Sequence, residues 1–177
     1  MKLKSKIMDE AAVRRSMARI THEIIEKNRG VSDVCLLGIK RRGIPLAGML
    51  TENLLKFENV EVPVGHIDIT RYRDDLDGEA PIHEGSEFPC DIANRNVIIV
   101  DDVIYTGRTV RAAIEAVFNF GRPKSIQLAV LVDRGHRELP IRPDFVGKNI
   151  PTSHEELVSV MIDEIDSETG VFLYQLD

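Results

Sequence analysis

Residues 97–110 carry the groups that a phosphorylated sugar would need. They read Val-Ile-Ile-Val-Asp-Asp-Val-Ile-Tyr-Thr-Gly-Arg-Thr-Val. A threonine- and glycine-rich turn that opens a helix offers hydroxyl groups, backbone N–H groups and the positive end of the helix dipole, all of which favour a phosphate. Asp101 and Asp102 would repel a phosphate, so they suit ribose hydroxyl groups or a Mg²⁺ ion. The stretch therefore predicts a site that binds the hydroxyl groups of a sugar on one side and its phosphate on the other.

Two other interpretations of this stretch are weaker. One is an ordinary strand–helix unit with a solvated acidic loop, and the other is the acid pair of a phosphoacceptor receiver domain. Neither predicts Thr-Gly-Arg-Thr at residues 106–109, so close behind the two aspartates. We therefore favour the sugar phosphate site.

The elements around this stretch must bring its polar groups to one edge of a sheet. Residues 97–100 are a continuous β-branched run, which indicates a strand buried on both faces, and a helical pattern begins at Val110. Further apolar runs lie at 34–39 and 126–132, with helical patterns between them. This order predicts an α/β fold, in which helices flank a parallel β-sheet. Ligands of such sheets bind at the carboxyl ends of the strands, where the acids and the turn lie.

A second candidate loop follows the strand at 34–39. Lys40, Arg41 and Arg42 stand between two glycines and directly before a helical pattern at 46–55. A cationic loop at the start of a helix suits a polyanion, although the same residues could form a basic surface turn. Beside the acid pair, the loop predicts a pyrophosphate site.

Residues 97–109 resemble the phosphoribosyl pyrophosphate (PRPP) signature of type I phosphoribosyltransferases. The resemblance implies that Asp101 and Asp102 hold the 2′- and 3′-hydroxyl groups of the ribose, while the loop after them wraps the 5′-phosphate. It implies a Mg²⁺ cofactor, held mainly by the substrate diphosphate, with the two aspartates as candidate ligands. It also implies a small hood over the sheet and a flexible flap or hairpin. The residues of this stretch expected to bind PRPP or nucleotide, besides the aspartates, are Val103, Tyr105, Thr106, Gly107, Arg108 and Thr109.

The flap is expected at about 71–91. A strand pattern at 60–70 precedes it, and the residues after it are polar, with no clear periodicity. Closing a flap over a reactive intermediate excludes water, and Arg71 and Arg73 would then reach the diphosphate. Arg73 is therefore a candidate catalytic residue together with the acid pair. Composition alone is equally consistent with a loop that holds incidental arginines, and the family resemblance favours the flap.

The chain is more specifically similar to the PyrR family of pyrimidine operon attenuators, which are also uracil phosphoribosyltransferases. The similarity rests on residues 38–43, 67–75, 101–113 and 131–152. It implies the reaction uracil + PRPP → UMP + pyrophosphate, with Arg134 near the nucleotide and Val158 beside uracil. A structural ion pair is the alternative role for Arg134. The alternative functions are a phosphoribosyltransferase with no RNA-binding role, one that acts on a purine base, and a regulator with a vestigial active site.

The same resemblance implies that UMP or UTP promotes binding to an mRNA leader hairpin. Residues 7–29 read as a helix that Asp9 caps, and basic side chains follow one another along it at helical spacing. Such a face is more often simply solvated. Ala18 and Arg41 stand where other family members often have hydroxyl residues, which bears on the choice of RNA sequence. The candidate RNA-binding residues are Arg15, Arg19, His22, Lys27, His136 and Arg137.

Length and composition agree with these expectations. A chain of 177 residues suits one domain, spanning 1–177, with the hood at about 133–165 plus the N-terminal segment. The net charge of −6 means that any RNA-binding face must be local. Two cysteines make no disulfide framework, and no run resembles a signal peptide or a membrane span, so we expect a cytoplasmic protein. We also expect a homodimer or a higher homo-oligomer.

Overall fold

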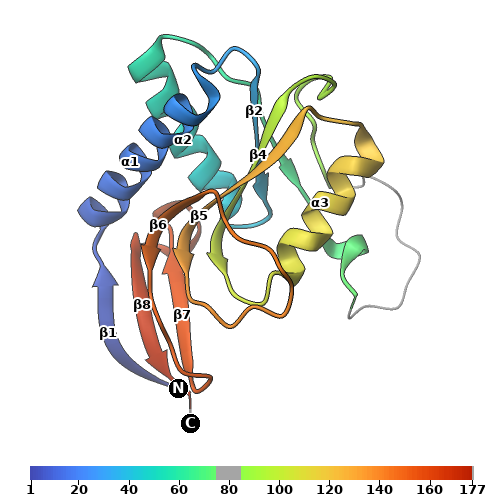
Figure 1. Cartoon of the computed structure of the whole chain (residues 1–177). Helices are drawn as coiled ribbons and strands as arrows, with labels where there is room; N and C mark the ends of the chain where they lie inside the picture. Colours follow the sequence, from blue (N-terminus) through green and yellow to red (C-terminus); the bar gives the residue numbers. More distant parts are fainter. Residues whose placement is uncertain (75–84, 177) are drawn as a thin grey trace.

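A five-stranded parallel sheet forms the centre of the protein, with strand order β3-β2-β4-β5-β6 (Figure 1). The computed structural model describes residues 1–74 and 85–176. The strands of this sheet are β2 (Val34–Ile39), β3 (Val64–Ile67), β4 (Asn96–Ile104), β5 (Ser125–Asp133) and β6 (Phe145–Asn149). The helices are α1 (Glu10–Asn28), α2 (Gly43–Glu58), α3 (Arg108–Phe120) and the single turn α4 (Asp163–Asp166), and a 3₁₀ turn, η1, spans Thr70–Tyr72.

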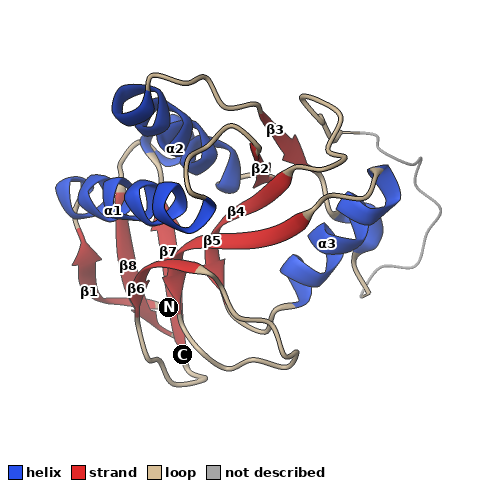
Figure 2. Ribbon diagram, turned by 45° about the horizontal axis from the view of Figure 1, so that its top comes forward, coloured by secondary structure: helices blue, strands red, loops and turns tan. Residues whose placement is uncertain are grey.

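Helices cover both faces of this sheet, as the uninterrupted apolar strands predict. Figures 1 and 2 show α1 and α2 on one face and α3 on the other. Ile98 and Val100 of β4 join the core under α1 and α2, whereas Val97 and Ile99 join the core under α3. Successive side chains of a strand point to opposite faces, so a strand covered on both sides must be apolar throughout.

A smaller antiparallel sheet, with order β1-β8-β7, packs beside the parallel one. It consists of β1 (Lys2–Met8), β7 (Glu156–Met161) and β8 (Gly170–Gln175). This arrangement unites the first and last strands of the chain, and both termini lie at its lower end in Figure 1. Alternate residues of β7 are buried, which is the period expected of a sheet with one covered face.

The predicted α/β class and parallel sheet are confirmed, with corrections to several element boundaries. The first helix begins at Glu10 rather than residue 7, because residues 2–8 pair with β8 as strand β1. Asp9 caps this helix by accepting a hydrogen bond of 2.8 Å from the backbone N–H of Ala12. β4 continues to Ile104, so the two aspartates belong to the strand instead of following it. Residues 145–149 form the edge strand β6, although the sequence there shows no strand pattern.

Cys35 and Cys90 are free thiols whose sulfur atoms lie 3.9 Å apart. Burial is the main reason that the pKa of Cys35 rises to about 12. In the part of the chain that the structure describes, no helix is both long and apolar enough to span a bilayer.

Candidate active site

The acid pair lies at the carboxyl end of β4, in the middle of the parallel sheet. Asp101 is only 7% exposed, and it accepts a hydrogen bond of 2.9 Å from the backbone N–H of Asp102. Asp102 accepts one of 2.8 Å from the N–H of Val103. Burial raises the pKa of both carboxyl groups, and the charge of Asp102 raises that of Asp101 further. The pair therefore favours a ligand that brings hydroxyl donors or a cation.

The predicted phosphate loop follows at the start of α3. Gly107 adopts a φ of +93°, a conformation that side chains disfavour, and it immediately precedes the helix. The N–H of Arg108 donates to the hydroxyl of Thr106 at 3.3 Å. The first N–H groups of any helix lack acceptors within it, so the start of α3 presents donors together with the positive dipole end. The loop has the backbone features that a phosphate site requires.

The side chain of Arg108 turns outward from this loop. Its Nε donates to Glu138 at 2.6 Å and its Nη1 to Asp74 at 2.5 Å, on an exposed surface. A cavity of about 220 Å³ lies beside it, lined by Arg73, Asp74, Arg108 and Thr109. Arg73 therefore lies close to the phosphate loop. Residues 75–84, the middle of the predicted flap, lie outside the described residues.

The cationic loop reaches the same place from β2. A Cβ atom on Gly43 would overlap with the carbonyl oxygen of Val100, the residue before Asp101, so the start of α2 packs directly against β4. Lys40 donates to Asp68 at 3.3 Å. Arg42 donates to both carboxylate oxygens of Asp166, from Nε at 3.0 Å and from Nη2 at 2.7 Å. The structure thus brings the cationic loop and the acid pair together, as predicted.

The segment after β5 surrounds a second cavity, of about 360 Å³, lined by residues that include Arg134, His136 and Thr152. Arg134 is 5% exposed, and its guanidinium lies 4.0 Å from the centre of the Tyr105 ring. It donates to the backbone carbonyls of Ser153 and Glu156, at 3.3 and 2.8 Å, and to the hydroxyl of Thr152. Arg134 therefore connects the segment after β5 with the first residue of β7 and with the ring of Tyr105.

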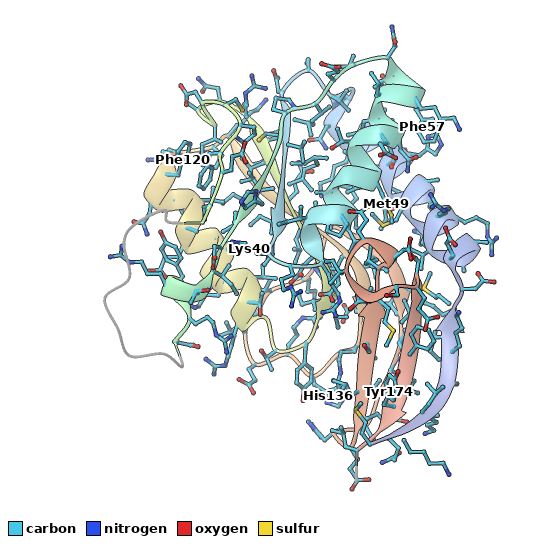
Figure 3. The ribbon with its side chains drawn as sticks, turned by 180° about the vertical axis from the view of Figure 1, so that it is seen from behind. Lys40, Met49, Phe57, Phe120, His136 and Tyr174 are labelled. Atoms are coloured by element: carbon cyan, nitrogen blue, oxygen red, sulfur yellow. The ribbon has the colours of Figure 1, made fainter. Side chains whose placement is uncertain are left out.

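Val158 of β7 is 6% exposed and belongs to the main apolar core. Its side chain is therefore occupied by packing, and its backbone is the part that remains for a base. Figure 3 labels Lys40 near the middle of the molecule and His136 lower, toward the antiparallel sheet.

The predicted RNA-binding residues fall into two groups. On α1, Arg15 and Arg19 line a groove of about 350 Å³ against Lys148 of β6. Arg19 is anchored there, because it donates to the carbonyls of Val146 and Gly147 at 3.1 and 2.6 Å.

The other two candidates on α1 have partners on neighbouring elements. Lys27 pairs with Asp144 at 2.8 Å, and His22 stacks on Phe57 with ring centres 4.4 Å apart.

The second group of predicted RNA-binding residues, His136 and Arg137, lies in the segment after β5. The side chain of Arg137 is only 20% exposed, so little of it is accessible to an RNA. Its guanidinium bonds to Asp133 and to the carbonyls of Ile141 and Tyr105, so it holds the segment together. His136 contacts the carbonyl of Thr152 at 2.6 Å and packs near His154. Arg137 thus has a structural role that sequence reasoning missed.

Asp166 and Glu138 are the other site residues that sequence reasoning missed. Each binds an arginine of a predicted anion loop, Arg42 or Arg108, from a distant part of the chain. Asp166 lies outside every stretch that carries the family resemblance. Glu138 lies within residues 131–152, but nothing in that stretch indicated that it would pair with Arg108.

The side chains present fit part of a Mg²⁺ site, because the carboxylates of Asp101 and Asp102 are adjacent at the end of β4 and Mg²⁺ prefers oxygen ligands. No group of three or more metal-binding side chains occurs among the residues at 1–74 and 85–176. An ion here would therefore need oxygen atoms from a ligand as well as from Asp101 and Asp102.

Comparisons with known proteins agree with this geometry. The model of the phosphoribosyl transferase domain matches residues 5–164. The chain is 60% identical over 175 residues to the bifunctional protein PyrR of Brevibacillus brevis, covering 98% of each chain. It is 57% identical over 177 residues to that of Clostridium novyi, covering 99% of each.

Solved structures show the same fold at low identity. A hypoxanthine-guanine phosphoribosyltransferase of Bacillus anthracis superposes with a TM-score of 0.73 at 17% identity, covering 99% of this chain and 100% of the other. The hypoxanthine phosphoribosyltransferase of Trypanosoma cruzi gives 0.74 at 20% identity, covering 99% and 98%. The full-length similarity to the curated relatives and the match to the domain model lead to one conclusion: the chain belongs to the phosphoribosyltransferase family and, within it, to the PyrR proteins.

Proposed function

We propose that the protein transfers the phosphoribosyl group of PRPP to uracil, giving UMP and pyrophosphate, and that it also regulates pyrimidine operons by binding an mRNA leader hairpin. The observation that carries the enzymatic part is the meeting of three features at one edge of the sheet. These are the acid pair with its buried Asp101, the backbone loop that opens α3 and the cationic loop at 40–42. They match the hydroxyl groups, the 5′-phosphate and the diphosphate of a single PRPP molecule. The PyrR relatives support the choice of uracil.

The proposed reaction separates charge, and the site has groups for both charges. As the bond from C1 to the diphosphate oxygen breaks, positive charge grows on the ribose ring and negative charge on the leaving diphosphate. Asp101 and Asp102 orient the ring and offset the positive charge, while Lys40 and the arginines of its loop offset the negative charge. Mg²⁺, when bound to the diphosphate, would supply further neutralisation of the leaving group. Holding the sugar and the base in line supplies much of the remaining acceleration.

The base is expected under the segment that follows β5, between the acid pair and β7. The backbone of Val158 is the proposed partner of uracil, and Arg134 is the proposed neighbour of the nucleotide. No residue is required as a general base, because the N–H of uracil is itself acidic. Asp102 is the candidate if one acts, because burial raises the pKa of its carboxyl group toward that of a useful base.

The test of the enzymatic proposal is pyrophosphate release from PRPP with each free base in turn. We expect release with uracil and none with hypoxanthine or guanine. Turnover of a purine base, with uracil inert, would contradict the pyrimidine assignment. Purine-specific turnover would still be phosphoribosyl transfer, so the two parts of the proposal are tested separately.

The regulatory proposal rests on the face formed by α1 and β6. Arg15 and Lys148 are exposed, and within the described ranges neither takes part in an ion pair. Free cations beside a groove suit the phosphates and 2′-hydroxyl groups of RNA. Arg19 lines the groove but also holds β6, so its substitution tests structure as well as binding.

We expect UMP or UTP to strengthen binding to a leader hairpin, and Arg15→Ala or Lys148→Ala to weaken it without loss of transferase turnover. Arg14→Ala is a matched control on α1, because Arg14 is exposed and pairs locally with Glu10. Equal binding to unrelated hairpins, with or without nucleotide, would argue against regulation. We further propose that the protein acts in the cytoplasm as one transferase domain in a homodimer or a higher oligomer.

A further inference from the structure

Arg42 of the cationic loop is held by a carboxylate that lies 124 residues away in the sequence. We propose that Asp166 is a positioning residue for the transfer reaction: it fixes the guanidinium of Arg42 beside the acid pair, where the diphosphate of PRPP binds. This inference rests on the proposed function, because it assumes that the loop at 40–42 receives the diphosphate. Asp166 itself does not touch the substrate in this account.

Contacts that do not involve Arg42 also hold the carboxylate of Asp166 in place. One of its oxygens accepts a hydrogen bond of 2.9 Å from the backbone N–H of Ile162, and its own N–H donates to the carbonyl of Ile162 at 2.7 Å. The neighbouring turn is held by the hydroxyl of Thr169, which accepts from the N–H of Asp163 at 3.1 Å. A carboxylate fixed in this way defines where a bound arginine must lie.

The pairing is bidentate, which fixes the orientation of the guanidinium plane as well as its position. Nε and Nη2 of Arg42 each donate to a different oxygen of Asp166, at 3.0 and 2.7 Å. Arginine suits such a fork, whereas lysine offers only a point charge. The two side chains are 34% and 17% exposed, so the pair is partly shielded from water.

Arg42 also lies near the acid pair, because the next residue, Gly43, packs against the carbonyl of Val100, the residue before Asp101. Its hydrogen bond to Asp166 is the largest cause of its raised pKa, and the charge of Asp102 raises it further. In return, the charge of Arg42 opposes the effect of burial on the pKa of Asp102. Arg42 is thus anchored by Asp166 and close enough to interact with the charge of Asp102, so it is near the place where a leaving diphosphate would form.

Lys40, in the same loop, is a cation that lacks such a bidentate anchor. Its ammonium group makes one contact of 3.3 Å with Asp68, and its side chain is 43% exposed. A long side chain held this loosely must be ordered again whenever ligand binds, which weakens binding. Asp166 removes that requirement for Arg42.

The experiment measures binding of Mg²⁺–pyrophosphate and Mg²⁺–PRPP by calorimetry in the absence of any base, together with KM and kcat. Asp166→Asn keeps an oxygen for the N–H of Ile162 but removes the charge that Arg42 requires. We expect about tenfold weaker binding of both ligands and a rise in KM for PRPP that exceeds the change in kcat. Arg42→Gln should have an effect of similar size, and the double variant should be no worse than Arg42→Gln alone.

Glu168→Gln is the matched control, because it removes an ion pair with Lys6, at 3.5 Å, from the same part of the chain. It should bind both ligands like the wild type. Arg42→Lys keeps the charge without the fork, so we expect an intermediate loss, and it tests the inference if Asp166→Asn fails to fold.

Wild-type affinities in Asp166→Asn, or losses that multiply in the double variant, would overturn the inference. If the wild type itself binds no PRPP, the proposed function fails first, and the two failures are therefore distinguishable.

Discussion

The two predicted anion loops stand at matching places in the fold but are built differently. Each follows a central parallel strand and opens a helix, α2 after β2 and α3 after β4. The loop at 106–109 offers mainly its backbone, and its one cation, Arg108, is turned away toward Asp74 and Glu138. The loop at 40–42 offers side-chain charge, and carboxylates from other parts of the chain hold two of its cations.

The two loops therefore depend on different parts of the chain. A backbone loop depends on a few local residues, above all a glycine that can adopt a positive φ. A side-chain loop depends on the partners that orient its long, flexible cations. The first should therefore be sensitive to change within the loop itself, and the second to change far from it.

Replacing both acids tests the part of the site that the two loops share. Asp101→Asn with Asp102→Asn should lower kcat/KM for PRPP by about 10³-fold or more, because groups that stabilise developing charge each contribute about 10²–10³-fold. The fold should persist, because asparagine retains the oxygens that accept the backbone hydrogen bonds. Steady-state kinetics beside circular dichroism would check both points, and near-normal turnover would exclude the pair from catalysis.

A change in the backbone of the loop at 106–109 should weaken PRPP binding more than removal of the Arg108 side chain. Gly107→Ala forces a side chain into a φ of +93°, a strain of about 1–2 kcal/mol, so we expect KM for PRPP to rise roughly tenfold. Arg108→Ala keeps the backbone N–H and should raise KM by less than about threefold. If the arginine variant were the more damaged of the two, the loop would bind phosphate through its side chain.

In the cationic loop at 40–42, the contribution of an exposed charge to PRPP binding should depend on the salt concentration. Lys40→Ala removes an exposed charge that is weakly held by Asp68, and we expect KM for PRPP to rise by about threefold at low ionic strength. The difference from the wild type should shrink in 0.5 M salt, since exposed charges are then screened within about 4 Å. A salt-independent defect would indicate a structural role for Lys40.

The smallest expected effect concerns stability. Burial raises the pKa of Asp101 in the folded protein, so the charged form is less favourable there than in the unfolded chain. The associated stability is fully present below the unfolded pKa of about 3.9 and is lost as the pH rises through the raised folded value. Asp101→Asn should therefore melt about 2–4 °C above the wild type at pH 8, and this difference should fade toward pH 4. A lower melting temperature at pH 8 would show that the charge of Asp101 supports the fold.

Much of the parallel sheet was predictable, because strands buried on both faces must be apolar throughout. Residues 34–39 and 97–100 show this pattern, and both lie in strands of the sheet. The strand β6 was missed because it lies at the edge of the sheet, where residues such as Lys148 and Asn149 remain exposed and polar. The strand β1 was missed for a similar reason, since most of its residues face solvent.

From the sequence alone one could predict a phosphate loop at 106–109, an acid pair at 101–102 and the family, because these features depend on neighbouring residues whose types must occur in order. Only the tertiary structure decided which cations are anchored, which are free and which serve the fold. Arg42 and Arg137 look alike in the sequence, yet one meets Asp166 beside the acid pair and the other holds its own segment together. The physical reason is that a long charged side chain takes its position from partners that the fold brings near, and those partners lie outside any local motif.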